Sequence, residues 1–136
     1  VLNADPTVGA DVHFLNTGVP HAVAFLDKLE GLDISKLGAY LRYHEAFSPK
    51  GTNANFARIL SPGHIAIRTY ERGVEDETLA CGTGACAAVV ASVLNDLTDE
   101  EVIVKLLGGE LSVRWDRKVN HVFLEGPAVK VFDGVL

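Results

Sequence analysis

The sequence predicts an α+β domain in which a mixed, mostly antiparallel β-sheet curves like a barrel around one central, buried α-helix. The segment Thr83–Leu94 is built almost entirely of Ala, Val, Cys and Leu, with Ser92 as a polar residue toward its end. A helix that is apolar on every face is buried on every face, and this one is too short to cross a bilayer. Strand-like segments fill most of the remaining chain, so we expect sheet around the helix.

The segments ahead of this helix are short and divided by turn residues. We expect a strand over Val12–Leu15 and a helix from Pro20 to about Leu29, because proline fits the first turn of a helix. Asp33 is a typical N-cap residue, and it predicts a second helix with apolar residues on one face. Two strands then flank the turn signal Ser61-Pro62-Gly63, and they cover Ala54–Leu60 and His64–Glu71.

The residues that follow the buried helix supply the rest of the expected sheet. The pair Gly108-Gly109 indicates a hairpin turn between the first two strands of this region. We expect four strands here: Val102–Leu107, Glu110–Trp115, His121–Glu125 and Ala128–Phe132.

Composition narrows the class of protein. A chain of 136 residues is long enough for one domain with a real core. The net charge of −6 argues against nucleic acid as a partner, and no apolar run reaches membrane-spanning length. Two cysteines five positions apart do not form a disulfide framework, so we expect a reduced, cytoplasmic setting. The chain opens with Val1 and contains no methionine, which indicates a removed first residue or a piece of a longer protein.

Cys81 is the strongest candidate for chemistry because it stands directly before the buried helix, in the run Ala80-Cys81-Gly82-Thr83-Gly84. The first turn of a helix carries N–H groups without a helical partner and a partial positive charge. Such an end binds carboxylate or phosphate and favours a thiolate. A free cysteine is otherwise often a small buried hydrophobe, which is our interpretation of Cys86. The pattern predicts a base or nucleophile at Cys81 beside an anion site.

The charged loop before Cys81 is a candidate substrate clamp. Arg72 offers the fork that fits a carboxylate, and Glu71 can hold an ammonium group. We interpret the acidic run at positions 75–77 as a solvated face.

Two asparagines and one histidine are further candidates. Asn53 and Asn55 are either turn-forming residues or amides that recognise the donor and acceptor groups of an amino acid. We place His21 near the site, although a lone histidine is more often structural than catalytic. The other four histidines, at positions 13, 44, 64 and 121, show no ligand spacing, so we predict no metal. No P-loop or dinucleotide fingerprint indicates a cofactor.

Together these motifs resemble the diaminopimelate epimerase family over nearly the whole chain. The matching stretches, in order, are Thr17-Gly18-Val19-Pro20-His21, Gly51-Thr52-Asn53-Ala54-Asn55-Phe56, Glu71-Arg72-Gly73, Ala80-Cys81-Gly82-Thr83-Gly84-Ala85-Cys86, Gly108-Gly109-Glu110-Leu111 and Leu124-Glu125-Gly126-Pro127-Ala128.

The resemblance implies a cofactor-independent and metal-free amino-acid epimerase that interconverts LL- and meso-diaminopimelate in lysine and peptidoglycan biosynthesis. In this family two cysteines, one from each of two similar halves, face each other across the substrate α-carbon. One removes the α-proton as a thiolate, and the other returns a proton as a thiol. By resemblance Cys81 is the cysteine of the second half, Gly82 and Thr83 bind the α-carboxylate through backbone N–H groups, and Asn53, Glu71 and Arg72 hold the distal end of the substrate.

The chain departs from the family in two places. Val19 stands where many members carry Asn, and the Cys-Gly-Asn-Gly stretch that holds the other catalytic cysteine does not occur. Residues 1–136 therefore look like a single domain, the C-terminal half of such an enzyme. We expect the missing N-terminal half to be its partner, with the lone chain inactive and a homodimer compatible with the exposed face. In the family the C-terminal tail packs against the first half, so here the final strand would lie loose or pair with another molecule.

Two other functions are compatible with the residues. One is half of a proline racemase-like enzyme, which uses the same two-cysteine mechanism, although the loop between Glu71 and Cys81 matches that family less well. A non-catalytic module would hold an anion at the helix start with an inert Cys81.

Overall fold

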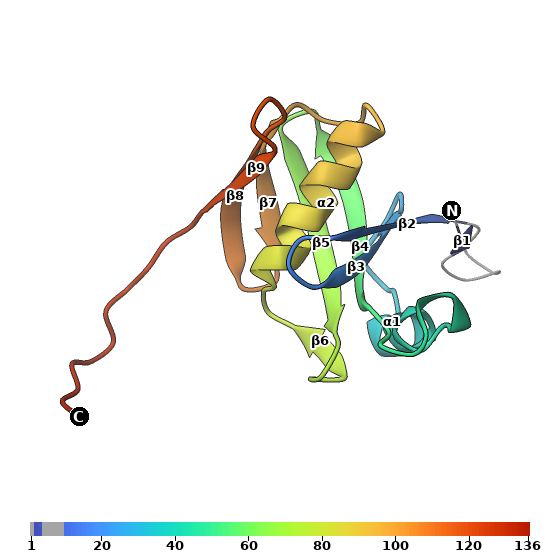
Figure 1. The fold of residues 1–136 in the computed structure, drawn as a ribbon, viewed down its shortest axis with the longest axis horizontal. Helices are drawn as coiled ribbons and strands as arrows, with labels where there is room; N and C mark the ends of the chain where they lie inside the picture. Colours follow the sequence, from blue (N-terminus) through green and yellow to red (C-terminus); the bar gives the residue numbers. More distant parts are fainter. Residues whose placement is uncertain (1, 4–9) are drawn as a thin grey trace.

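The computed structural model describes residues 2–3 and 10–136, and every structural statement below refers to these residues. A nine-stranded mixed sheet runs in the order β1-β2-β3-β4-β5-β7-β8-β9, with β6 paired to β5. The sheet curls around α2 (Figure 1). The strands are β1 (Leu2–Asn3), β2 (Asp11–Asn16), β3 (Pro20–Phe25), β4 (Asn53–Ser61), β5 (His64–Glu71), β6 (Asp76–Thr78), β7 (Glu101–Leu106), β8 (Gly109–Asp116) and β9 (His121–Glu125); the helices are α1 (Ile34–Arg42), α2 (Gly82–Leu94) and the 3₁₀ turn Glu45–Phe47.

Helix α2 confirms the central prediction, because it packs into the main core between strands from both ends of the sheet. Its small side chains allow the surrounding strands to approach closely, and Ala85, Ala88 and Val89 are fully buried. The core around it joins Val23 of β3 to Trp115 of β8. The all-round apolarity of the segment thus reflects sheet that covers the helix on several sides.

Helix α1 covers the opposite face of the same strands and forms a second core. The Asp33 side chain accepts a hydrogen bond from the backbone N–H of Lys36 over 3.1 Å, as its N-cap position predicts. Gly38 permits close contact with β5, because a Cβ at this position would lie 2.3 Å from Tyr70 Cβ. The apolar face of α1 packs on Ala54 and Phe56 of β4.

Two pairings in the centre of the sheet bring together polar residues that are far apart in the sequence. β3 and β4 are parallel, with His21 opposite Asn53, and α1 lies in the connection between them. β4 and β5 are antiparallel, with Asn55 directly opposite Thr69. Since side chains alternate along a strand, Asn53, Asn55 and the core residue Ala57 share the face of β4 that looks toward α2.

Two expected elements are wrong. Pro20–Phe25 is a strand where we expected a helix to Leu29, because it pairs with β2 on one side and β4 on the other. It is buried on both faces and therefore lacks the alternation of a half-exposed strand. Residues 126–136, including the expected strand Ala128–Phe132, contain no strand and extend away from the domain (Figure 1). Phe132 is 82% exposed, and no described strand lies beside this segment to pair with it.

Candidate active site

Cys81 occupies the N-cap position of α2, separated by two residues from the end of the short strand β6. Its backbone is extended (φ −141°, ψ 106°), and its carbonyl accepts the first helical hydrogen bond from Ala85 N–H over 2.9 Å. The N–H groups of Gly82 and Thr83, as first helical residues, have no partner within the helix. Cys81 is 9% exposed, so the residue lies at the edge of the core.

The Thr83 hydroxyl connects Cys81 to the sheet. Thr83 Oγ1 lies 3.6 Å from Cys81 Sγ and 2.8 Å from His21 Nε2. The backbone carbonyl of the same residue accepts a hydrogen bond from Thr17 Oγ1 over 2.8 Å. The first turn of α2 is therefore held by the segment that leads from β2 into β3.

A buried chain of hydrogen bonds continues from Thr83 into the sheet. His21 Nδ1 lies 3.0 Å from Asn55 Nδ2, which also donates to the Ala22 carbonyl over 3.1 Å. Asn55 Oδ1 in turn accepts from Thr69 Oγ1 over 2.9 Å. His21 and Asn55 are fully buried. Asn55 is thus a member of a polar network in the core, and of the two roles considered for it the turn-forming one does not apply, because it lies in β4.

Burial lowers the pKa of His21 from 6.5 to about 4, and the positive charge of Arg72 contributes in the same direction. His21 is therefore a neutral imidazole near pH 7, and it carries its single ring proton on one of two nitrogens. A neutral ring at this place acts through its hydrogen bonds rather than through charge.

Gly84 makes room for this network. A Cβ at position 84 would lie 2.5 Å from Asn55 Oδ1, 3.3 Å from His21 Cε1 and 3.4 Å from Cys81 Cβ. The glycine is therefore required by the close approach of α2 to the buried amide and imidazole.

The predicted clamp residues stand at the end of β5. Glu71 is the last residue of that strand and half-buried, and Arg72 follows it in a turn. Asn53 holds this turn: its Oδ1 accepts from Arg72 N–H over 2.7 Å, and its Nδ2 donates to the Pro20 carbonyl over 3.0 Å. Asn53 lies in a strand, so it too is not turn-forming.

Two of the three acidic residues after the clamp, Glu75 and Glu77, are structural, which corrects their interpretation as part of a solvated face, whereas Asp76 is exposed as expected. Glu75 accepts hydrogen bonds from Arg42 Nε and Gly73 N–H, each over 2.9 Å, and from the Tyr43 hydroxyl. Glu77 forms a two-pronged ion pair with Arg68, at 2.6 and 2.9 Å. These contacts tie the turn to α1 and to β5.

Cys86 lies in α2 as expected, but it is more exposed than the prediction of a buried residue allowed, and more so than Cys81. Burial of part of the thiol raises the pKa of Cys86, and the neighbouring Cys81 raises it further.

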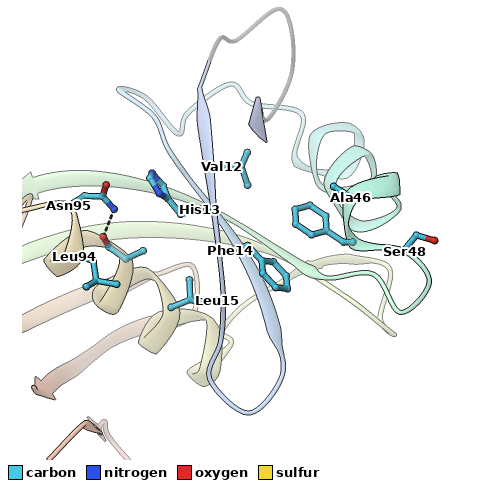
Figure 2. Close-up of a pocket in the computed structure, with 10 residues that line it drawn as sticks. Val12, His13, Phe14, Leu15, Ala46, Ser48, Leu94 and Asn95 are labelled. Carbon is cyan, nitrogen blue, oxygen red and sulfur yellow. Dashed lines mark hydrogen bonds between the residues drawn. The ribbon is translucent and has the colours of Figure 1, made fainter. Parts of the chain in front are cut away.

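A large depression on the described surface lies elsewhere. It measures about 710 Å³ and is lined by β2, the 3₁₀ turn and the end of α2. Figure 2 shows its walls, among them Phe14, Leu15 and Leu94, which are mostly apolar and bring no group of titratable side chains together. A smaller depression of about 470 Å³ lies beside Arg72, and its wall includes Val19, the residue that departs from the family pattern.

The polar network contains two residues that were not candidates from the sequence, Thr17 and Thr69, and it includes Asn55, which was a candidate for a different role. One sequence signal was available, because two asparagines at positions i and i+2 of an apolar strand point to the same face. Nothing in the sequence indicated Thr17 or Thr69. Among the described residues no group of three His, Cys, Asp or Glu side chains is placed to hold a metal ion, and no described helix has the length and apolarity to span a membrane.

The curled sheet around a central helix is the diaminopimelate epimerase-like fold, which solved proteins of the phenazine biosynthesis PhzF family share. One from Enterococcus faecalis superimposes with a TM-score of 0.55 at 19% identity, covering 74% of this chain and 35% of that one. One from Bacillus anthracis gives a TM-score of 0.57 at 16% identity, covering 85% and 37%.

The sequence defines the family. The diaminopimelate epimerase family model matches residues 13–131, and the chain belongs to this family of isomerases. The diaminopimelate epimerase of a Hydrogenobaculum species is 50% identical over 127 residues, and that of Aquifex aeolicus is 46% identical over 125. These alignments cover 91% and 90% of this chain but only 46% and 45% of the two relatives. The chain thus spans about half the length of the relatives it matches.

Proposed function

We propose that this chain supplies one side of the active site of a diaminopimelate epimerase, with Cys81 as the residue that exchanges a proton with the substrate α-carbon. The single observation that carries the proposal is the position of Cys81, at the N-cap of a buried helix with the Thr83 hydroxyl 3.6 Å from its sulfur. The relatives' name supplies the substrate, diaminopimelate, and the family resemblance implies its LL and meso forms.

The substrate α-carboxylate binds the free N–H groups of Gly82 and Thr83. The partial positive charge of the helix end stabilises that carboxylate, and it stabilises the additional negative charge when the α-proton leaves. The same end stabilises a thiolate at Cys81. Proton removal then forms an S–H bond and breaks the Cα–H bond, and the electron pair stays on the carbanion next to the carboxylate. The reaction needs no cofactor and no metal in this proposal.

The distal end of the substrate carries a second ammonium and a second carboxylate, and the turn after β5 offers groups for both. Arg72 binds the carboxylate and Glu71 binds the ammonium group. Asn53 already uses one amide proton and one oxygen lone pair to hold the turn, and it retains one of each for the substrate. Arg72 Nη1 donates to the Lys50 carbonyl over 3.3 Å, which orients its fork.

Inversion requires a second group on the opposite face of the α-carbon. Cys86 does not fulfil this role, because it lies more than one turn along the same helix and points in another direction. In this proposal a second polypeptide segment, the other half of the enzyme, supplies the opposing cysteine. The lone chain is therefore inactive, and the complete enzyme works in the cytoplasm.

The test measures α-hydrogen exchange and stereoinversion of diaminopimelate in deuterated water. We expect neither from the lone chain, and both after the N-terminal half of a relative is added as a separate polypeptide. Cys81→Ala abolishes the restored activity, whereas Cys86→Ala, the matched control, retains it. Full-rate inversion by the lone chain, or by the mixture that contains Cys81→Ala, would contradict the proposal.

A further inference from the structure

We infer that Asn55 is a positioning residue: it fixes the tautomer of His21 and thereby directs the Thr83 hydroxyl proton toward Cys81 Sγ. Asn55 does not contact the sulfur, and it acts through two intervening side chains. The significance of this arrangement for proton transfer rests on the function proposed for Cys81, whereas the arrangement itself is independently measurable.

The orientation of the Asn55 amide is determined by its other partners. The group 3.1 Å from the Ala22 carbonyl must be the NH₂, because a carbonyl oxygen can only accept. The opposite end of the amide, 2.9 Å from the Thr69 hydroxyl, is then the oxygen. The strands fix both contacts, because Asn55 and Thr69 are opposite each other in the β4–β5 pairing.

This orientation assigns the proton of His21. The Asn55 NH₂ lies 3.0 Å from His21 Nδ1, so that nitrogen accepts a hydrogen bond and carries no proton. A neutral imidazole then carries its proton on Nε2, which donates to Thr83 Oγ1 over 2.8 Å. The Thr83 oxygen receives this bond, and its own proton remains available for the sulfur 3.6 Å away.

A hydroxyl that donates to sulfur stabilises the thiolate, and the opposite tautomer would remove this donor. With the proton on Nδ1, His21 Nε2 would accept the Thr83 proton and turn it away from Cys81. His21, Asn55 and Thr69 are buried, so water does not compete with the hydrogen bonds among them, whereas Thr83 at the end of the network is exposed. The charged or titratable groups that bear on this site are Arg72, at the end of β5, and the thiol of Cys86 in α2.

Two other surface features do not define a functional site. The large depression lined by β2 and the end of α2 has no convergent polar groups, and the exposed tail has no described partner. The Asn55 network has defined donors and acceptors at every step.

The first experiment needs no substitution. Nitrogen-15 NMR of the histidine side chains in the unmodified chain at neutral pH distinguishes protonated from unprotonated ring nitrogens. We expect His21 to show an unprotonated Nδ1 and a protonated Nε2. A protonated Nδ1, or an equal mixture of the two tautomers, would overturn the inference without affecting the proposed epimerase function.

The second experiment follows the rate of Cys81 alkylation by iodoacetamide as a function of pH. Asn55→Leu and Thr83→Val each slow the reaction near neutral pH by about tenfold, the effect expected for loss of a hydrogen bond to a charged group. The double variant is no slower than either single one, because both remove the same donor. Thr83→Ser keeps the hydroxyl and should react at the rate of the unmodified chain. Additive losses in the double variant would overturn the inference.

A matched control separates this effect from general destabilisation. Ser92 is also fully buried in α2, and its hydroxyl bonds the Val89 carbonyl and Thr98 over 2.8 and 2.7 Å, far from the site. Ser92→Ala should lower the free energy of unfolding but leave the His21 tautomer and the alkylation rate unchanged.

If Asn55→Leu does not fold, the His21 tautomer in the unmodified chain and the comparison of Thr83→Val with Thr83→Ser still decide the question. In the mixture with the N-terminal half, epimerase activity without the expected tautomer would contradict the inference alone. The expected tautomer without activity in that mixture would contradict the proposed function alone.

Discussion

Arg42 Nε donates to Glu75 Oε1 over 2.9 Å, so the last turn of α1 is joined to the turn that presents Arg72. Glu75 adopts a positive φ of 60°, a conformation that non-glycine residues rarely occupy. Three donors converge on its carboxylate, from Arg42, Tyr43 and Gly73. The clamp turn is therefore positioned by a helix on the far side of the sheet.

The Glu75 cluster predicts a stability change at low pH. The Tyr43 hydrogen bond, followed by those from Arg42 and Gly73, lowers the pKa of Glu75 from 4.5 to about 2. A carboxyl whose folded pKa is lowered stabilises the fold above its ordinary pKa, and this contribution is lost as the pH falls from about 4.5 toward 2. Glu75→Gln should flatten the pH dependence of the unfolding free energy in that range, measured by urea denaturation. Glu30→Gln, at an exposed position, is the control and should retain the wild-type slope.

His21 predicts a second transition at higher pH. Its folded pKa of about 4 lies below the ordinary 6.5, so the unfolded chain binds more protons between these values. The free energy of unfolding should therefore be greatest above about pH 6.5 and fall by on the order of 3 kcal/mol as the pH decreases to about 4. In His21→Gln this part of the pH dependence disappears. In the exposed control His64→Gln it persists, and its loss there would contradict the assignment to His21.

Gly84→Ala should destabilise the domain although alanine is the better helix former. The added methyl group would meet Asn55 Oδ1 at 2.5 Å, and the amide is held from both ends by its hydrogen bonds. We expect a cost of about 1–3 kcal/mol from overpacking, against a gain of about 1 kcal/mol in helix propensity. Thermal unfolding measures the difference. Gly63→Ala, where a Cβ has open space, should be nearly neutral, and equal effects at both positions would refute the packing argument.

Cys81 should react faster than Cys86 with a thiol reagent, although Cys86 is the more accessible of the two. Cys86 is the more exposed, but burial and the nearby Cys81 raise the pKa of its thiol, so little of it is thiolate at neutral pH. Cys81 has the helix end and the Thr83 hydroxyl beside it. Iodoacetamide labelling followed by mass spectrometry should therefore modify Cys81 first. Faster labelling of Cys86 would show that access outweighs the stabilisation of the thiolate.

Much of the fold was predictable because its signals are local. The apolarity of α2 and the Asp33 N-cap each depend on a few neighbouring residues, and both predictions are confirmed. The strand β3 was not predictable from the same rules: Pro20 is compatible with a helix start, and only the pairing with β2 and β4 decides for a strand. For residues 128–132 the error is the reverse: the apolar residues are typical of a strand, but the segment is exposed and no described strand pairs with it.

The residues of the candidate site were likewise predictable only where the signal is local. Cys81 and the residues after it form one continuous motif, so the helix start was visible in the sequence. The contacts of Asn55 depend on the register of three strands, which no local pattern reveals. Substrate contacts of Asn53, Glu71 and Arg72 stay predictions.

The hydrogen-bond chain behind Cys81 makes the chemistry of this thiol depend on the order in which the domain folds. Its links close loops of 14, 34 and 62 residues, between Thr69 and Asn55, Asn55 and His21, and His21 and Thr83. Contacts between residues so distant form late, after the intervening chain has paid the entropy of loop closure. A partly folded molecule, with α2 formed but β3 not yet docked beside β4, holds Cys81 at a helix start without the contact between His21 and Thr83. In the proposed mechanism, the hydrogen-bond donor to Cys81 Sγ is therefore fully oriented only when the parallel pair of β3 and β4 closes.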